Sequence, residues 1–323
     1  MSPQSPSEDF QQHIAGLRQQ VESQLCRCAV SRGWPPSLQD AVEYSLLAGG
    51  KRLRPVLVLL ACEVCGGDQQ TALHAACALE AIHTYSLIHD DLPAMDNDDY
   101  RRGRLTSHRV FGEALAILAG DALLTLAFEL ISESPANATV RADCLGILAR
   151  AAGGAGMVGG QVLDLEAERG PFRRQSTPEI PLKTQLNPAS SHGTTNSRVE
   201  ELNQIHKMKT GALIASALEM GAAVAQAEPH ARERLRTYGL CTGPAFQIAD
   251  DLLDVTGDAN RLGKTTGRDV DLGKLTYPAL LGIENSRTEA LNLVRQACEA
   301  VAVFGLRSSH LQQLAKFIVE RDH

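Results

Sequence analysis

Two aspartate clusters hold the side chains of this sequence that are best suited to chemistry. One occupies residues 90–96 (DDLPAMD) and the other residues 250–254 (DDLLD). Carboxylate oxygens are hard ligands that suit Mg²⁺, and bound Mg²⁺ keeps several waters and bridges to phosphate oxygens. The clusters therefore indicate a metal site that handles a phosphate or a diphosphate.

The second cluster follows a regular helical pattern. Asp250 and Asp254 are four residues apart, which places both carboxylates on one helix face, with Gln247 one turn earlier on that face. Like charges at this spacing repel one another, so a cation or solvent must compensate them. This spacing favours a bound metal.

The first cluster needs a bend in the chain. Asp90 and Asp96 are six residues apart and would lie on different faces of a regular helix. Pro93 cannot continue a helix, so we expect it to bend the backbone and bring Asp96 back toward Asp90. A single cluster of this kind is typical of a solvated helix end, whereas two clusters that each end an apolar helix favour a site.

Cationic residues accompany the carboxylates. Residues 49–55 (GGKRLRP) set three cations beside two glycines, and Lys209 and Thr210 precede an apolar helix whose first N–H groups favour an anion. Lys264 and Lys274 each follow a glycine in a loop after the second cluster, where a flexible cationic segment can close over a phosphate. Such stretches are also typical of solvated turns, but Arg and Lys are the groups that a diphosphate needs where no metal neutralises it.

Helices are expected to position these groups. Strand signals are almost absent, so the sequence predicts an all-α, single-domain helical bundle over residues 1–323. Residues 169–197 contain four prolines without apolar periodicity and predict an extended loop, either a lid or an inert insertion. Apolar residues recur at helical spacing in the segments 71–91, 111–132, 140–165, 198–226 and 229–256.

Composition excludes some classes of protein. Lys and Arg total 31 against 38 Asp and Glu, a net charge of -7, which argues against nucleic acid as a general partner. No apolar run reaches the ~18 to 20 residues needed to cross a bilayer, so we expect a soluble protein without a membrane span. The eight cysteines are scattered, and Cys62 and Cys65 have no second pair or histidines at zinc-site spacing. We therefore expect reduced thiols and a cytoplasmic protein.

Together the motifs resemble one family. Residues 90–103 are similar to the first aspartate-rich motif of trans-prenyl diphosphate synthases, in the form with two extra residues found in bacterial farnesyl and plant geranylgeranyl diphosphate synthases. Residues 246–254 (FQIADDLLD) are similar to the second motif. The resemblance runs from Gly49 to about Gly282 and is closest to bacterial farnesyl diphosphate synthases. It implies an isoprenoid-synthase-type bundle with a central active-site cavity, and a homodimer.

The resemblance also implies roles for individual residues. The metal ligands would be Asp90, Asp96 and Asp250, holding three Mg²⁺ ions, and catalysis would rest on these three and Lys209. Isopentenyl diphosphate would be held without metal by Lys51, Arg54, His83 and Arg102. The allylic diphosphate would be contacted by Arg101, Lys209, Thr210, Gln247, Lys264 and Lys274.

The implied reaction is a head-to-tail condensation. The allylic diphosphate loses pyrophosphate as metals and lysines neutralise the developing charge, and the double bond of isopentenyl diphosphate attacks C1 of the allylic cation. Loss of a proton completes the step. The sequence offers no obvious strong base, so the released pyrophosphate is a candidate acceptor.

Product length is expected to depend on the helix before Asp90. Tyr85 and Ser86 precede Asp90 by five and four residues, which places them about 6 to 8 Å below the metal site. An aromatic residue at the Tyr85 position resembles farnesyl diphosphate synthases and predicts a C15 product, with C20 or C10 synthases as alternatives.

Two other classes share part of the pattern. A class I terpene cyclase usually has a different second motif and lacks the co-substrate cations, and a regulatory subunit is expected to lose a cluster or the arginine pair. Two features depart from the family: residues 169–197 are longer than the usual connection, and His323 stands where many relatives have Lys.

Overall fold

Helices form nearly all of the structure, a computed structural model that describes residues 8–29, 32–170, 172, 195–256 and 275–320. This confirms the all-α prediction. A two-residue hairpin pairs β1 (Tyr100–Arg101) with β2 (Arg104–Leu105). The helices are α1 (Glu8–Ala29), α2 (Pro36–Leu46), α3 (Leu53–Val64), α4 (Gln69–Asp90), α5 (Ser107–Phe111), α6 (Glu113–Ser132), α7 (Ala138–Ala152), α8 (Met157–Arg169), α9 (Thr195–His206), the π-helix η1 (Lys207–Gly211), α10 (Ala212–Val224), α11 (Pro229–Thr256), α14 (Tyr277–Leu281), α15 (Ile283–Val301), the 3₁₀-helix η2 (Ala302–Ser308) and α16 (Ser309–Glu320).

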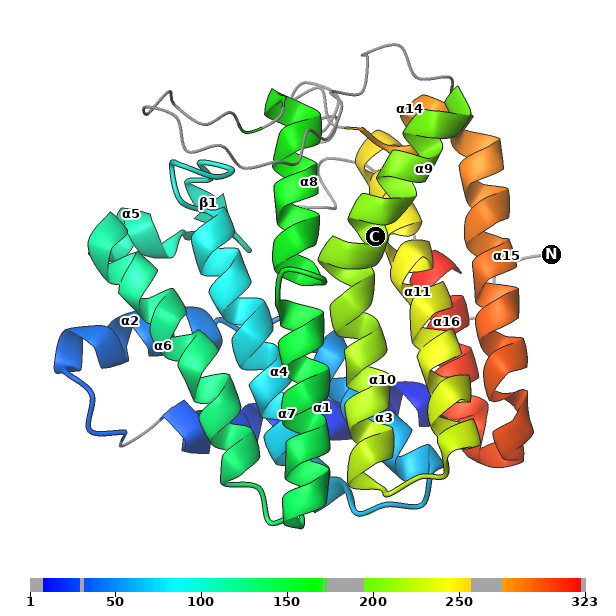
Figure 1. The fold of residues 1–323 in the computed structure, drawn as a ribbon, viewed down its shortest axis with the longest axis horizontal. Helices are drawn as coiled ribbons and strands as arrows, with labels where there is room; N and C mark the ends of the chain where they lie inside the picture. Colours follow the sequence, from blue (N-terminus) through cyan, green and yellow to red (C-terminus); the bar gives the residue numbers. More distant parts are fainter. Residues whose placement is uncertain (1–7, 30–31, 171, 173–194, 257–274, 321–323) are drawn as a thin grey trace, which may run out of the picture.

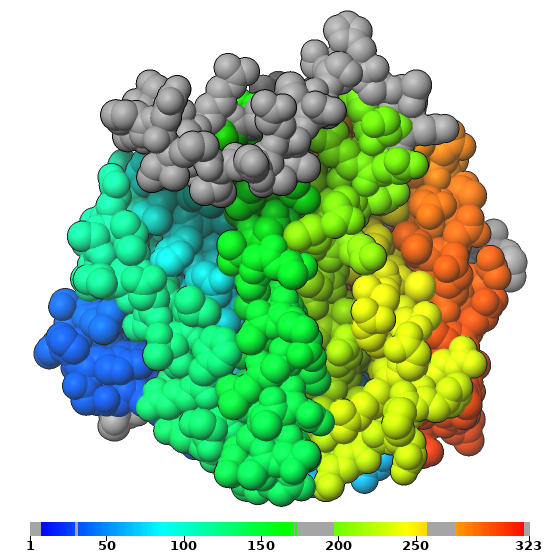
Figure 2. All heavy atoms as spheres, viewed as in Figure 1, coloured from blue at the N-terminus to red at the C-terminus, as the bar shows by residue number. Residues whose placement is uncertain are grey.

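The long helices run side by side in a bundle (Figure 1). α3 packs against α4 and α10, α6 covers α4 on one side, and α11 packs between α10 and α15. Figure 2 shows the side chains of α7, α8, α10 and α11 closing one face of the molecule, so that little of α3 is seen from this side. Leu59, Leu79 and Leu218 are completely buried at the centre.

Local signals explain where α4 begins and ends. The Asp68 side chain caps its first turn by accepting hydrogen bonds from the backbone N–H groups of Gln70 (3.2 Å) and Thr71 (2.9 Å). The helix ends at Asp90, immediately before the turn that contains Pro93. A predicted helix over 71–91 is therefore found at 69–90.

Two predicted helices prove to be composite. The segment 140–165 is two helices, α7 and α8, because Gly153, Gly154 and Gly156 interrupt it with a turn. The segment 198–226 contains α9, the π-helix η1 and α10 in one continuous run. Of the predicted loop 169–197, most lies outside the described residues, as do Lys264, Lys274 and His323.

One helix meets the criteria for a membrane span by length and composition alone. α6 has 20 residues and a mean hydropathy of 2.0, with 44% of its most apolar stretch buried. On these two criteria the expectation that no apolar run is long enough was wrong. The core helix of a globular protein passes the same test, and Leu123, Leu126 and Leu130 of α6 are buried in the bundle, so α6 is weak evidence for a span.

Candidate active site

The first aspartate cluster folds back on itself at the end of α4. The backbone N–H of Asp96 donates to the carbonyl oxygen of Asp90 at 2.8 Å, and that of Asn97 donates to the carbonyl oxygen of Leu92 at 3.1 Å. These hydrogen bonds close the turn that contains Pro93. The predicted bend is present, and it brings Asp96 to the same end of α4 as Asp90.

Asp90 lies in an environment that disfavours its charge. Burial raises the pKa of Asp90 to about 6, and the Asp96 and Asp91 carboxylates add to this rise, while Lys209 and Arg101 oppose it. A divalent cation would neutralise the repulsion between these carboxylates and favour the ionised form of each. The donor set of this turn, hard carboxylate oxygens that repel one another, therefore fits Mg²⁺.

Among the described residues, Asp91, unlike Asp90, forms a direct ion pair with an arginine. It is 3% exposed and accepts hydrogen bonds from Nε of Arg101 at 2.8 and 3.0 Å, while Nη2 of Arg101 lies 2.6 Å from Oδ1. This paired contact fixes Arg101 on strand β1 beside the carboxylate turn. Sequence reasoning named Arg101 but not the carboxylate that holds it.

Lys209 reaches the same site from the π-helix η1. Its Nζ lies 2.5 Å from Oδ2 of Asp164 on α8. Burial lowers the pKa of Lys209, but the Asp164, Asp90 and Asp96 carboxylates outweigh burial and raise it overall. Lys209 is therefore a cation held between α8 and the end of α4. Short π-helical stretches are frequent at functional sites because they redirect side chains.

Sequence reasoning missed Asp164. The only signal in the sequence was its neighbour Gly160, one turn earlier on α8. A β-carbon at Gly160 would lie 2.2 Å from the backbone nitrogen of Lys209, so only glycine lets α8 approach η1 this closely. That approach brings Asp164 within reach of Lys209.

A chain of hydrogen bonds joins η1 to the second cluster on α11. The hydroxyl of Thr210 donates to Oε1 of Gln247 at 3.3 Å, and Nε2 of Gln247 donates to Oδ1 of Asp251 at 3.1 Å. Asp251 is 4% exposed and its Oδ2 accepts the backbone N–H of Tyr277 at 3.1 Å. Thr210 and Gln247, both predicted site residues, thus lie together, and Asp251 anchors Gln247 to the start of α14.

Basic groups gather at the start of α3. Nε of Arg54 is buried and has no hydrogen-bond partner among the described residues, which an anion would supply. Arg102 donates to the carbonyl oxygen of Gly49. Lys51, three residues before Arg54, is exposed. Burial lowers the pKa of His83 well below its usual value, and Arg54 and Arg102 lower it further, so His83 is neutral. Three of the four predicted residues, Arg54, His83 and Arg102, are therefore close enough to act on one another.

Arg52, in the middle of the same basic stretch, is structural. Its guanidinium lies 2.7 Å from Glu80 and 2.8 Å from Glu22, and it donates to the carbonyl oxygen of Leu46 at 2.7 Å. The side chains of Arg52 and Glu80 are 1% and 2% exposed. This buried ion pair turns Arg52 away from the cations on either side of it.

Electrostatics connects this basic site to α11. Burial lowers the pKa of Arg54, and the carboxylates of Glu80 and Asp250 oppose that change. Asp250 of the second cluster is therefore close enough to act on Arg54 of α3. The structure brings together the end of α4, the π-helix, the start of α3 and the second cluster.

The predicted chain-length residues lie on the last turns of α4. Tyr85 is 7% exposed and packs edge-on against His89, with ring centroids 5.6 Å apart at 75°. Nε2 of His89 lies 3.1 Å from the carbonyl oxygen of Ile117 on α6. The hydroxyl of Ser86 donates to the carbonyl oxygen of His83 at 2.9 Å, within the helix.

Known proteins with similar sequences and structures are named as prenyl transferases. The chain is 44% identical over 315 residues to a dimethylallyltranstransferase of Fischerella ambigua (96% of this chain, 83% of that protein). It is 42% identical over 308 residues to a geranylgeranyl diphosphate synthase of Cyanophora paradoxa (95% of each). Among solved structures, an FPP/GFPP synthase from Zymomonas mobilis shares 37% identity and a TM-score of 0.78 (96% and 99% coverage). A geranyltransferase from Legionella pneumophila shares 34% identity and a TM-score of 0.80 (98% of each).

The sequence model of one family spans most of the chain. It matches residues 35–304, which include both aspartate clusters and all of the predicted diphosphate-binding residues. The fold, the grouping of carboxylates and cations, and these matches agree. The chain belongs to the polyprenyl synthetase family, and it is a prenyltransferase.

Proposed function

We propose that this protein condenses isopentenyl diphosphate with dimethylallyl or geranyl diphosphate to give farnesyl diphosphate. The observation that supports this most directly is the presence of two unlike groups of charged side chains close to one another. One consists of carboxylates that fit Mg²⁺, around Asp90, and the other of cations without carboxylate ligands, around Arg54. Two diphosphates handled differently are what a condensation of this kind needs.

The metal-free site suits the diphosphate that remains attached. Lys51, Arg54 and Arg102 hold isopentenyl diphosphate, with the neutral imidazole of His83 as a further hydrogen-bonding group. The unsatisfied buried Nε of Arg54 supports this role, because a bound phosphate oxygen would satisfy it. Without a metal, this diphosphate is not activated as a leaving group.

The carboxylate-lined site suits the diphosphate that leaves. Mg²⁺, which we propose binds as three ions at Asp90, Asp96 and Asp250, would supply positive charge to the departing pyrophosphate. Arg101, Lys209, Thr210 and Gln247 contact the same group, and the positions of Lys264 and Lys274 lie outside the described residues. Asp91 holds the Arg101 side chain in place, and Asp164 holds that of Lys209.

The two substrates and the released pyrophosphate account for every bond and proton in the proposed reaction. The C1–O bond of the allylic diphosphate breaks with its electron pair on pyrophosphate, and the double bond of isopentenyl diphosphate forms the new bond to C1. The proton lost from the product goes to pyrophosphate. The bundle contributes by orienting the substrates and excluding water from the allylic cation.

A C15 product is supported by Tyr85, a buried aromatic ring near the base of the proposed substrate region. A C20 product is the second candidate, because several relatives at 42% to 46% identity are named geranylgeranyl diphosphate synthases. We favour C15, since Tyr85 packs against His89, and His89 in turn contacts α6, which limits the freedom of the Tyr85 ring to turn aside.

One assay tests the proposed reaction. The purified chain is incubated with Mg²⁺, isopentenyl diphosphate and either dimethylallyl or geranyl diphosphate, and products are separated by chain length. Linear C15 diphosphate is expected, whereas cyclic hydrocarbons would indicate a terpene cyclase and absence of product a regulatory subunit. The Asp90→Ala and Asp250→Ala variants should lose several orders of magnitude in kcat, and near-normal turnover in either would refute the assignment.

A homodimer and a cytoplasmic location belong to the same proposal. On α6, Ile117 and Leu118 are 43% and 55% exposed, and a second copy of the chain would cover them. Sedimentation of the chain and of its Leu118→Glu variant tests this, since the variant is expected to shift toward monomer. The scattered cysteines support a reducing compartment, and fractionation of the source cells tests the location.

A further inference from the structure

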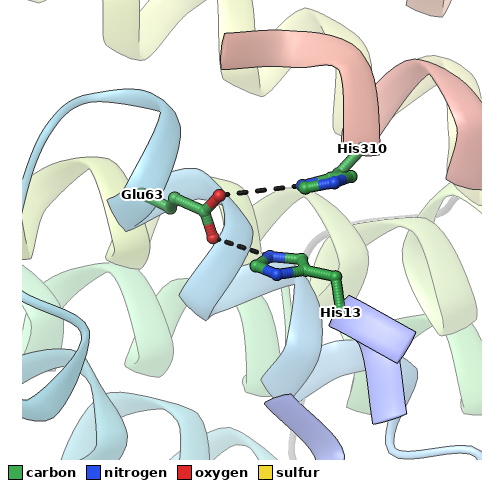
Figure 3. A group of neighbouring side chains, drawn as sticks. All are labelled: His13, Glu63 and His310. Carbon is green, nitrogen blue, oxygen red and sulfur yellow. Dashed lines mark hydrogen bonds and ion pairs between the residues drawn. The ribbon is translucent and has the colours of Figure 1, made fainter. Parts of the chain in front are cut away.

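Two histidines and a glutamate from three helices meet outside the proposed active site. His13 lies on α1, Glu63 near the end of α3 and His310 at the start of α16, and both imidazole rings turn toward the carboxylate (Figure 3). One possible ligand atom from each residue lies within 4.8 Å of the other two. The side chains of His13, Glu63 and His310 are 29%, 33% and 18% exposed, so solvent and ions reach them.

The separations approach those of a metal centre. Nε2 of His13 lies 2.9 Å from Oε2 of Glu63, and Nδ1 of His310 lies 3.7 Å from Oε1. Two ligands of a tetrahedral Zn²⁺ ion, with bonds of about 2.0 to 2.1 Å, lie about 3.3 Å apart, between these two values. The longer distance exceeds a hydrogen bond, so no direct hydrogen bond joins His310 to Glu63. A cation would complete this contact.

Surrounding groups orient the three side chains. Nε2 of His310 faces Oδ2 of Asp9 at 3.7 Å, an arrangement in which the second ring nitrogen of a metal-bound histidine meets a carboxylate. Nε2 of Gln69 donates to Oε2 of Glu63 at 2.7 Å. The rings of His13 and His310 are stacked, with centroids 4.1 Å apart at 20°, which keeps the two imidazoles side by side next to the carboxylate.

We propose that His13, Glu63 and His310 form a second metal site that binds Zn²⁺ or a similar borderline divalent ion, with water in the remaining position. Two imidazoles and one carboxylate suit Zn²⁺, whereas Mg²⁺ prefers oxygen ligands alone. Glu63 lies nine residues after Arg54 on α3, about 13 Å along the helix, so the two sites are distinct. The proposal does not depend on the proposed reaction.

A bound ion would connect the first and last described helices to the centre of the bundle. α1 and α16 each contribute one histidine, and α3 contributes the glutamate. α3 is the helix whose other end carries Arg54. The ion would therefore stabilise the folded chain by binding it in preference to the unfolded chain.

Zinc binding is tested in a chain whose catalytic carboxylates have been removed. The Asp90→Asn, Asp250→Asn double variant is titrated with ZnCl₂ by calorimetry, and its thermal unfolding is followed with and without the metal. One Zn²⁺ per chain is expected, with Tm raised by roughly 4 °C at about 100 times Kd. Adding His13→Gln or His310→Gln should abolish both effects, and His230→Gln, at an exposed histidine on α11, should change neither.

Two results would overturn the proposal. One is Zn²⁺ affinity in the His310→Gln chain equal to that in the His230→Gln chain. The other comes from X-ray absorption of the zinc-loaded double variant, which needs no further substitution and so remains decisive if a histidine variant fails to fold. Two imidazole nitrogens at about 2.0 to 2.1 Å support the site, and a shell of oxygen alone refutes it.

Discussion

Nζ of Lys209 lies 2.5 Å from Oδ2 of Asp164, across the contact between the π-helix η1 and α8. The pairing explains how a lysine on a strongly apolar helical run stays charged next to the first aspartate cluster. Asp164 touches the cation and not, in our proposal, the substrate. We therefore regard it as a positioning residue for Lys209.

Asp164→Asn should lower kcat about 10- to 100-fold, because Lys209 would lose its charged partner and its fixed orientation toward the leaving pyrophosphate. Steady-state kinetics at saturating isopentenyl diphosphate measures this. Asp143→Asn is the control, since Asp143 pairs with Arg232 at the surface at 3.2 Å. Equal kcat in the two variants would exclude a role for Asp164 in positioning.

Gly120→Ala should lengthen the product. A β-carbon at Gly120 would lie 2.1 Å from Nε2 of His89, so His89 must move and Tyr85 loses the ring that braces it. Chain-length analysis should show a rising share of C20, as it should for Tyr85→Ala. Gly16→Ala is the matched control, because no atom lies within 4 Å of a β-carbon there. Unchanged C15 product in both Gly120→Ala and Tyr85→Ala would contradict the floor formed by Tyr85.

Asp90→Asn should stabilise the metal-free protein at alkaline pH. The pKa of Asp90 rises from 3.8 to about 6 on folding, mainly through burial. Its contribution to stability is therefore fully present below pH 3.8 and is lost as the pH rises through about 6. A shift of about two pKa units corresponds to up to about 3 kcal/mol in the free energy of unfolding.

Urea unfolding with a metal chelator present measures this difference. The free energy of unfolding of the variant should exceed that of the original chain at pH 8. The two values should match at pH values near the ordinary Asp pKa. Added Mg²⁺ should narrow the difference at pH 8, because the ion binds the original chain better. Asp40→Asn, at an exposed position on α2, is the control. A variant that is less stable than the original chain at pH 8 would show that the ionised Asp90 carboxylate does not destabilise the fold.

Glu80→Ala should destabilise the fold by about 3 to 5 kcal/mol, because it leaves the guanidinium of Arg52 buried without its 2.7 Å partner. Chemical denaturation provides the free energy of unfolding. Glu133→Ala is the comparison, because it breaks an ion pair with Arg32 in which the Glu133 side chain is 45% exposed. It should lower the free energy of unfolding by less than about 1 kcal/mol. Similar losses in the two variants would argue against a special role for the buried pair.

Much of the fold and of the site follows from local sequence. Helical periodicity predicted the bundle, and α11 has the predicted bounds of 229 and 256. Pro93 predicted the turn that brings Asp96 back to Asp90, because a proline cannot continue a helix. The resemblance supplied the residues that we propose bind the two diphosphates, and the family assignment agrees with the resemblance. The roles of those residues remain predictions.

Contacts between distant segments were decided only in three dimensions. Nothing in the sequence near Lys209 points to Asp164, and nothing near Arg52 separates it from Arg54, because burial and ion pairing depend on which helices pack together. The π-helix at Lys209 also escaped prediction, since helical periodicity continues through it, and the break between α7 and α8 was missed although Gly153, Gly154 and Gly156 mark it. The sequence by itself determined the helices and the reactive side chains they carry. Tertiary packing decided which of those side chains face the proposed site and which hold the others in place, because only packing sets the burial of each group and the distances between them.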